Sequence, residues 1–270
     1  MRRVLAAMWV VVFLVMGAML TAGPVAGGAG QTFHVTSPDL CGGTGTFEQA
    51  VKDANASSGK DTIEFDAGLR VDASSCGRLH QGPGQYPIVA TQAVDVVGNG
   101  ARIEGNQVWI DASGATNPVT ACPLSSAGHV WAAQSKGFIA VGELGKDNSG
   151  VDVSISGLDF DNLPSLAAAY ENASLTLADS QAKRINSFNN DCHLTAIAGT
   201  TGADITLRNV GISDSHAPGV GSGENDILGL IEGVDGDLVL DRVTLDSNVQ
   251  GRAVSWHNSA GVATAKIVTS

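Results

Sequence analysis

The sequence has few aromatic residues and few basic ones. Aromatic residues make up 5% of the 270 residues, and 15 Lys and Arg stand against 27 Asp and Glu. This acidic excess repels phosphate backbones, so nucleic acid is not an expected partner. Glycine is frequent instead, with 34 residues, and the apolar runs are short and broken by Gly, Asn and Asp. These features predict many short strands joined by tight turns.

The sequence also lacks the common catalytic and cofactor-binding motifs. It contains no P-loop, no dinucleotide fingerprint, no Gly-x-Ser-x-Gly, no CxxC pair and no EF-hand loop, and its histidines show no metal-ligand spacing. We therefore expect no catalytic residue, no metal and no cofactor. The acidic turns KDNSGVD (146–152) and DFDN (159–162) leave Ca²⁺ as an open alternative, although such residues more often hydrogen-bond to their own backbone.

The first thirty residues have the order of a secretory signal peptide. Arg2 and Arg3 precede an apolar run from Val4 to Leu20, and the small-residue stretch TAGPVAGGAG follows. We predict a signal peptide over 1–30 and an extracellular or cell-surface mature chain without a membrane span. Because the apolar run is long for a signal, an uncleaved anchor is the alternative. Without Arg2 and Arg3, 13 basic residues oppose 27 acidic ones, a formal charge of −14.

Four cysteines occur in this chain, at Cys41, Cys76, Cys122 and Cys192. An even number in an exported protein predicts two disulfides. Three pairings are possible, and proximity along the sequence favours Cys41–Cys76 and Cys122–Cys192.

An internal repeat predicts the architecture. Its four clearest copies have apolar first and third residues followed by a break: VSISGLDFDN (153–162), LTLADSQAKR (175–184), ITLRNVGISD (205–214) and LVLDRVTLDS (238–247). The third residues, with a fifth from AKIVTS, are spaced by 22, 30, 33 and 27 residues: Ile155, Leu177, Leu207, Leu240 and Ile267. Such a period in an all-β pattern is typical of a solenoid, in which stacked rungs form parallel sheets around one core.

The break in each repeat predicts a sharp bend. Its residues are Gly157, Asp179, Asn209 and Arg242, of which the first three readily adopt the left-handed conformation. Arg242 does not fit, so its rung is expected to turn differently. Earlier rungs are expected over 86–106, with Gly98 and Asn99 at the bend, and over 137–155. A further strand is expected before each repeat, and residues 111–136 are expected to form a long loop.

One segment predicts a helix, GTFEQAVKDANASSGKDTIEF (45–65). Thr46 is placed to cap it, with Gln49 as the capping-box partner, and Gly59 suits the turn after it. An apolar stripe lies at helical spacing: Phe47, Ala50, Val51 and Ala54. We expect this helix to cover the N-terminal end of the core. No comparable cap is apparent near Ile267, so we expect an open C-terminal rung where the chain could self-associate.

The stretch TFHVTSPDLCGGTGTFEQAVKDANASSGKDTIEF (32–65) resembles the opening of bacterial secreted right-handed parallel β-helix proteins, of the pectate-lyase-like and polymorphic outer-membrane-protein-like repeat kind. The resemblance lies in a strand, a cysteine-bearing turn, a helix with Ala-Val and Ala-Asn, and then Asp-Thr-Ile. It implies an all-β, right-handed parallel β-helix solenoid with an N-terminal capping α-helix. Residues 31–66 would form the first strand, the cap and the first rung, and 67–270 the remaining rungs.

The resemblance implies a fold rather than an activity, because β-helices include adhesins as well as pectate lyases and polygalacturonases. The polygalacturonase-like motifs Asn-Thr-Asp, Asp-Asp, Gly-His-Gly and Arg-Ile-Lys do not occur. The column after the bend reads Asp161, Lys183, Ser213 and Asp246, so its carboxylates are interrupted from rung to rung, as on a solvated face.

The strand before each repeat commonly lines the groove in this fold, and its outward candidates are Glu171, Glu232 and His257. Glu232, Trp256 and His257 are the candidate ligand-binding residues: Glu232 and His257 on neighbouring rungs could form a site, or together with Trp256 a shelf that binds a sugar. The alternative is an exposed acid and histidine beside a partly buried tryptophan.

The sequence thus predicts a non-catalytic extracellular or cell-surface protein in adhesion, or in binding a polysaccharide or a host or cell-surface partner. Two alternatives stay open: a polysaccharide lyase or glycoside hydrolase of the same fold, and a truncated relative without activity of its own.

Overall fold

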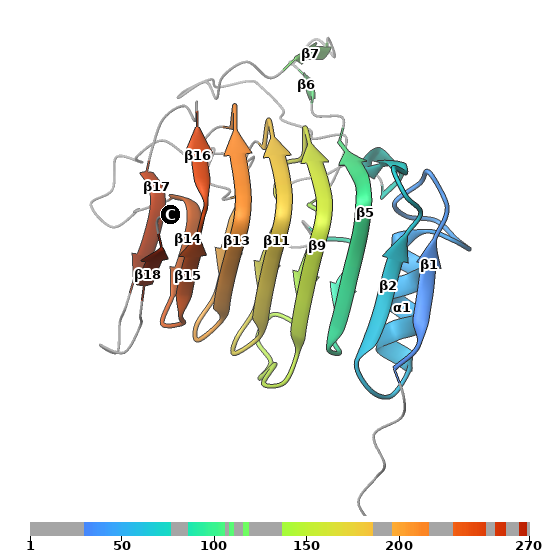
Figure 1. Ribbon diagram of the computed structural model, residues 1–270, viewed down its shortest axis with the longest axis horizontal. Coiled ribbons are helices and arrows are strands. Elements are labelled where there is room, and N and C mark those ends of the chain that lie inside the picture. The colour runs from blue at the N-terminus through green and yellow to red at the C-terminus, as the bar shows by residue number, and fades with distance from the viewer. Residues whose placement is uncertain are drawn as a thin grey trace, which may run out of the picture.

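The computed structural model describes residues 30–76, 86–105, 108–110, 116–118, 137–185, 196–215, 229–246, 252–257 and 265–268. These residues form parallel β-sheets and one α-helix (Figure 1). The predicted leader, Cys122 and Cys192 lie outside them. No helix in this part of the chain is long and apolar enough to cross a membrane.

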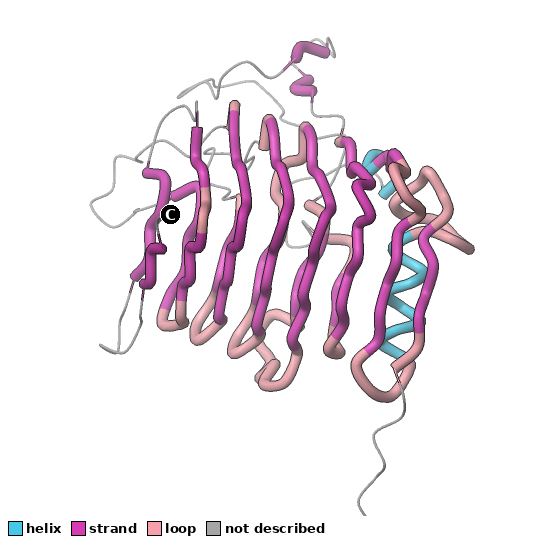
Figure 2. The backbone as a smooth tube through the Cα atoms, viewed as in Figure 1, coloured by secondary structure: helices cyan, strands magenta, loops and turns pink. Residues whose placement is uncertain are grey.

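The larger sheet has ten strands, and its strands stack side by side (Figures 1 and 2). Its main path runs in chain order through β1 (Thr32–Val35), β2 (Asp61–Phe65), β5 (Val94–Glu104), β9 (Asp152–Asp161), β11 (Ser174–Lys183), β13 (Asp204–Ser213), β15 (Leu238–Asp241) and β18 (Ala265–Val268). Two short strands join it from the side: β3 (Arg70–Asp72), paired with β5, and β16 (Thr244–Asp246), paired with β13.

The second sheet has six short strands, also parallel and adjacent in chain order: β4 (Val89–Ala90), β8 (Ile139–Val141), β10 (Ala167–Ala169), β12 (Ile197–Gly199), β14 (Gly229–Val234) and β17 (Arg252–His257). From β8 onward the chain alternates between the two sheets, so each circuit of the chain, one passage through both sheets, adds a further layer of strand to each. A separate antiparallel pair, β6 (Val108–Ile110) with β7 (Thr116–Pro118), places a strand inside the segment 111–136 that was expected to be loop alone.

The predicted repeat alignment is confirmed by the strand register. The third residues are paired from strand to strand: Ile155 with Leu177, Leu177 with Leu207, Leu207 with Leu240, and Leu240 with Ile267. The first four are buried in the core, with exposed fractions of 1%, 3%, 0% and 6%. The unequal spacing between repeats therefore reflects connections of different length outside a constant strand unit.

The predicted bend column is also confirmed. Asn99, Gly157, Asp179 and Asn209 have φ values of 51°, 63°, 50° and 52°. Arg242 was expected to turn differently, but this is wrong, because its φ is 55°. The strands before and after Arg242, β15 and β16, both pair with β13, and this pairing imposes the bend whatever side chain stands there. An arginine in this conformation costs on the order of 1 kcal/mol.

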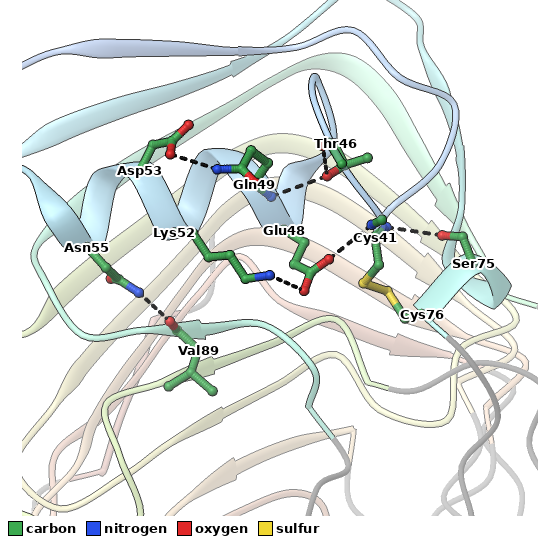
Figure 3. Close-up of polar contacts among 12 residues, drawn as sticks. Cys41, Thr46, Glu48, Gln49, Lys52, Asp53, Asn55, Ser75, Cys76 and Val89 are labelled. Atoms are coloured by element: carbon green, nitrogen blue, oxygen red, sulfur yellow. Dashed lines mark hydrogen bonds and ion pairs between the residues drawn. A yellow bond between two sulfur atoms is a disulfide. The ribbon is translucent and has the colours of Figure 1, made fainter.

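Helix α1 (Phe47–Ala56) begins where the sequence predicted. Thr46 is its N-cap and accepts a hydrogen bond from the Gln49 main-chain N–H at 3.2 Å (Figure 3). The reciprocal half of the capping box is not formed, because the Gln49 side chain donates to Asp53 at 2.8 Å instead. The residues of the apolar stripe are all buried, as predicted: Phe47, Ala50, Val51 and Ala54.

Asn55 joins this helix to the first strand of the smaller sheet. Its side-chain Nδ2 donates to the Val89 carbonyl at 2.7 Å (Figure 3). Its Oδ1 accepts from the Thr91 N–H at 2.8 Å. One amide thus satisfies the carbonyl of Val89 in β4 and the N–H of Thr91 just after this strand, which a neighbouring strand would otherwise bind. Since unpaired buried backbone groups are costly, the helix ends the smaller sheet without exposing its edge there.

A stack of phenylalanines continues from the helix into the core. The Phe47 ring lies 5.3 Å from Phe65 and 4.7 Å from Phe138, and Phe138 lies 5.1 Å from Phe160, measured between ring centroids. All four rings are at most 2% exposed. The helix is therefore packed as part of the core.

The disulfide expected between Cys41 and Cys76 is present, with Cα atoms 4.9 Å apart (Figure 3). It ties the turn before α1 to the 3₁₀ helix η1 (Ala73–Cys76), and the Cys41 N–H also donates to the Ser75 hydroxyl at 3.1 Å. At the other end, β17 and β18 are the last strands of their sheets within the described residues. Self-association there stays a prediction.

Replacing Phe47 with alanine is expected to lower the free energy of unfolding by about 3–5 kcal/mol, because a fully buried ring in contact with two others leaves a cavity. Urea denaturation of the two proteins measures this. Lys52→Ala on the exposed side of the same helix is the control, with an expected loss below about 1 kcal/mol. An unchanged midpoint for Phe47→Ala would mean that the helix does not close the core.

Replacing Cys41 and Cys76 with serine together is expected to reduce the free energy of unfolding by about 2–4 kcal/mol, because the bond closes a loop with a sequence separation of 35. Denaturation under non-reducing conditions measures the loss, and peptide mapping of the wild type verifies the pairing. Recovery of Cys41 linked to Cys122 or Cys192 would contradict the structure.

Candidate functional site

The outer face of the larger sheet, on the C-terminal side of the bend, carries two columns of polar side chains. They alternate along each strand with the buried residues Ile103, Phe160, Ala182 and Ile212. The first column is Arg70, Arg102, Asp159, Gln181, Gly211 and Thr244, and the second is Asp72, Glu104, Asp161, Lys183, Ser213 and Asp246. The predicted interruption of carboxylates from rung to rung is thus confirmed in register.

The N-terminal half of this face is a ladder of ion pairs. Arg70 pairs with Glu104, Arg102 with Asp159 at 3.8 Å, and Arg184 with Asp161 through Nε at 2.8 Å. The hydrogen bond to Asp161 raises the pKa of Arg184. These side chains are substantially exposed, and such pairs contribute less than about 1 kcal/mol each. We interpret this half as a solvated, charge-balanced surface.

The C-terminal half of the same face is hollowed into an open pocket of about 260 Å³. Strands β11, β13 and β16 and the bend at Arg242 form it. Its lining is mostly polar: Gln181, Asn209, Val210, Gly211, Ile212, Ser213, Arg242, Thr244 and Asp246. Val210 and Ile212 have buried side chains that point into the core, so their main chain forms part of the pocket wall.

The polar side chains of the pocket differ in whether they are already hydrogen-bonded or ion-paired within the protein. Asn209 Nδ2 already donates to Asp179 Oδ1 at 2.7 Å. Arg242 Nε lies 3.3 Å from Asp241 Oδ1, a long contact on a side chain that is 54% exposed. In the part of the chain that the structure describes, the exposed Gln181 side-chain amide makes no hydrogen bond of its own. The pocket therefore presents hydrogen-bond donors and acceptors to solvent.

This mixture suits hydroxyl groups as ligands. A hydroxyl both donates and accepts, so it can satisfy an amide, a guanidinium and a carboxylate in turn. The volume is below the ~300–1,000 Å³ typical of drug-sized ligands, which limits the occupant to one small ring or group. None of the described residues that line the pocket is aromatic, so binding by these residues would depend on hydrogen bonds rather than stacking.

The sequence-predicted site on the smaller sheet is assembled only in part. Glu232 on β14 is paired with Ser255 on β17, and Trp256 is paired with Gly233. Because neighbouring side chains on a strand point to opposite faces, Glu232 and Trp256 lie on opposite faces of the sheet. His257 is opposite Val234 in the register, and its side chain lies outside the described part of the structure.

Trp256 is packed against the core and does not form a shelf with Glu232. A Cβ atom on Gly233 would lie 2.1 Å from Trp256 Cζ3, and one on Gly199 would lie 3.4 Å from Cη2, so the ring lies along these two glycines. Its indole N–H donates to the Gly236 carbonyl at 2.8 Å. The expectation of a sugar-binding Glu232–Trp256 shelf is therefore wrong, because the register turns the ring inward.

Glu232 itself is half-buried on the outer side of the smaller sheet, between Ala198 and Ser255 in the register. Burial raises its pKa above the ordinary value of 4.5. Glu171, the other outward candidate, donates its main-chain N–H to Thr200 Oγ1 at 2.9 Å, while its own Oε2 is buried without a hydrogen-bond partner among the described residues. The structure gives no contact between these two carboxylates.

The acidic turns considered for Ca²⁺ are hydrogen-bonded within the protein. Asp147 Oδ1 accepts from the Ser149 hydroxyl at 2.6 Å and from Asn172 Nδ2 at 3.0 Å, and the hydrogen bond from Ser149 leads the causes that lower the Asp147 pKa. Among the described residues no group of three or more His, Cys, Asp or Glu is placed to hold a metal ion.

The pocket residues were not singled out from the sequence as a site. Gln181, Asn209 and Gly211 are ordinary strand residues in isolation. The signal that could have found them lies in the alignment of the repeats. In the first column, Gly211 occupies the position that is Gln181 on the preceding strand and Thr244 on the following one. Reading the column for a missing side chain would have located the pocket.

Replacing Glu232 with glutamine is expected to raise the melting temperature at pH 7. A carboxyl whose pKa is higher in the folded state favours folding when protonated, so its contribution is present below its unfolded pKa and is lost as the pH rises through its folded pKa. Glutamine does not titrate, so the difference between the two proteins should disappear at pH 4 and below. Thermal melts from pH 3 to 8 measure it, and a parallel offset at every pH would contradict the assignment.

No protein-family model and no curated protein matches this chain.

Proposed function

We propose that this chain is a right-handed parallel β-helix protein of the bacterial cell exterior, secreted or surface-displayed, that binds a glycan without transforming it. The proposal on fold is supported by the in-register repeat, by the alternation of the chain between two parallel sheets, and by the helix that closes the N-terminal end. The acidic charge and the leader-like N-terminal sequence support an exported protein.

The observation that carries the glycan proposal is the pocket over β11, β13 and β16. It combines an unbonded amide at Gln181, a weakly paired guanidinium at Arg242 and hydroxyl groups at Ser213 and Thr244 on an exposed, rigid sheet. Groups held on strands keep their geometry better than groups on loops, which favours selective binding. With hydrogen bonds alone and no stacking, affinity for one sugar unit is expected to be modest.

Binding without turnover is supported by the way the carboxylates of this face are used. Acid–base cleavage of a glycosidic bond needs two carboxyl groups at a fixed separation across the bond. Here Asp161 and Asp159 are engaged with arginines, and Lys183 and Ser213 separate Asp161 from Asp246 in their column. A lyase or hydrolase of the same fold becomes the better interpretation if turnover is observed.

The test compares Arg242→Gly with Arg184→Gly. Both arginines are exposed, are ion-paired with an aspartate and have positive φ, at 55° and 53°, so glycine suits either backbone. Only Arg242 lines the pocket. On a glycan array followed by calorimetry, we expect Arg242→Gly to weaken binding by roughly 10- to 100-fold, the range for a hydrogen bond to a charged group, and Arg184→Gly to bind like the wild type.

The same incubations, with pectins, alginate and glycosaminoglycans in the presence and absence of Ca²⁺, are followed by absorbance at 235 nm and by reducing-end release. Sustained turnover by the wild type would overturn the proposal of binding alone. Equal binding by both arginine variants would remove the pocket from it.

A further inference from the structure

Gly211 belongs to the pocket lining and leaves the outer face of β13 without a side chain at that position. Gly211 stands between Gln181 and Thr244 in the first outer column of the sheet. Gly211 lies within strand β13, and its φ angle is not in the left-handed region. The backbone conformation therefore does not require glycine here, and glycine weakens a strand slightly relative to residues with side chains. The reason for glycine at this position lies in the space above it.

That space is occupied by the side chain of Gln181. A Cβ atom added at Gly211 would lie 2.2 Å from Gln181 Oε1, 3.0 Å from Cδ and 3.2 Å from Nε2. The amide group thus lies across the bare main chain of the neighbouring strand, where it forms part of the pocket lining. The Gln181 main-chain N–H donates to Asp159 Oδ1 at 3.0 Å, so the strand beneath the amide is also tied to the preceding rung.

We propose that Gly211 is a positioning residue that holds the Gln181 amide flat in the pocket, and that this amide selects a neutral sugar ring by binding two adjacent hydroxyl groups. The inference rests on the proposed function and names its ligand class. A primary amide presents an acceptor and donors side by side, so it can accept from one hydroxyl and donate to the next.

An acidic sugar would be selected against at the same place. A hexuronic acid differs from the neutral hexose only at C6, where a carboxylate replaces the hydroxyl group, so the amide discriminates between the two when one of its hydroxyl partners is that of C6. A carboxylate at that place only accepts hydrogen bonds, so it would leave the amide oxygen of Gln181 unpaired, and an unpaired group in a binding site costs affinity. Arg242 in the lining would attract a carboxylate, but the carboxylates of Asp246 in the lining and of Asp241 beside Arg242 oppose it. We expect the methyl glycoside of a neutral hexose to bind more tightly than the matching hexuronic acid.

The experiment uses the wild type, Gln181→Ala, Gly211→Ala and the double variant. Each is titrated by calorimetry with methyl glucoside, galactoside and mannoside and with methyl glucuronide and galacturonide. Gly211→Ala is expected to fold with an unchanged melting temperature, because the three atoms nearest to the new Cβ all belong to the end of the flexible Gln181 side chain. Gly43→Ala is the matched control, since a Cβ there would meet nothing within 4 Å.

Each single variant is expected to weaken binding of the preferred neutral glycoside roughly tenfold, as for the loss of about one to two hydrogen bonds. Each should also reduce the preference for neutral over acidic sugars. The double variant should bind no more weakly than Gln181→Ala, because Gly211 acts only through the amide. A merely structural role for Gly211 would instead give a further loss in the double variant and a lower melting temperature.

The outcomes separate the two proposals. If Gly211→Ala binds like the wild type and with the same selectivity, the positioning role is wrong. If Gln181→Ala also leaves binding unchanged while Arg242→Gly weakens it, the pocket binds glycans but the amide does not select them. If the wild type binds none of these glycosides or the arrayed glycans, the proposed function fails and this inference fails with it.

Discussion

The in-register stacking of short parallel strands is the constraint on which the rest of this protein depends. Each circuit of the chain contributes one strand to each sheet, and hydrogen bonds to the next circuit are made only if the strands are aligned residue for residue. The apolar residue at the third position then falls on top of its counterpart, as from Leu177 to Leu207, and both are removed from water. Hydrogen bonding and burial thus favour the same register, and a slip of one residue would turn every buried side chain outward.

A stack of this kind has two ends, and the end at β1 is closed by a different element. There α1 replaces a strand: its apolar residues, led by Phe47, cover the core, and the Asn55 amide binds the main chain of β4 as a neighbouring strand would. The phenylalanine stack carries this contact inward to Phe138 and Phe160. Near β17, Trp256 lies inward over Gly233 and Gly199, so an aromatic ring also fills the core in the last described circuits.

The same register that builds the core also arranges the surface. Since every outer residue lies beside its counterpart on the next strand, side chains far apart in sequence form columns, and a column is altered wherever one member differs. Where neighbouring residues of the two columns carry opposite charges, they form ion pairs such as Arg70 with Glu104. These ion pairs lie on the surface and contribute little stability. Gly211 leaves one position of the first column without a side chain, and the neighbouring Gln181 lies across it in the lining of the pocket.

The sequence by itself determined the strand repeat, the residues at each bend and the capping helix, because these depend on local periodicity and on the conformational freedom of single residues. Ile155, Asn209 and Thr46 lie where their patterns predicted. Only the tertiary structure decided how side chains on neighbouring strands are oriented toward one another. It gave Arg242 the bend that its side chain disfavours, turned Trp256 inward away from Glu232, and laid the Gln181 side chain across Gly211. The physical reason is that these outcomes depend on pairing between strands, which is set by the whole stack and leaves no signature in any one segment.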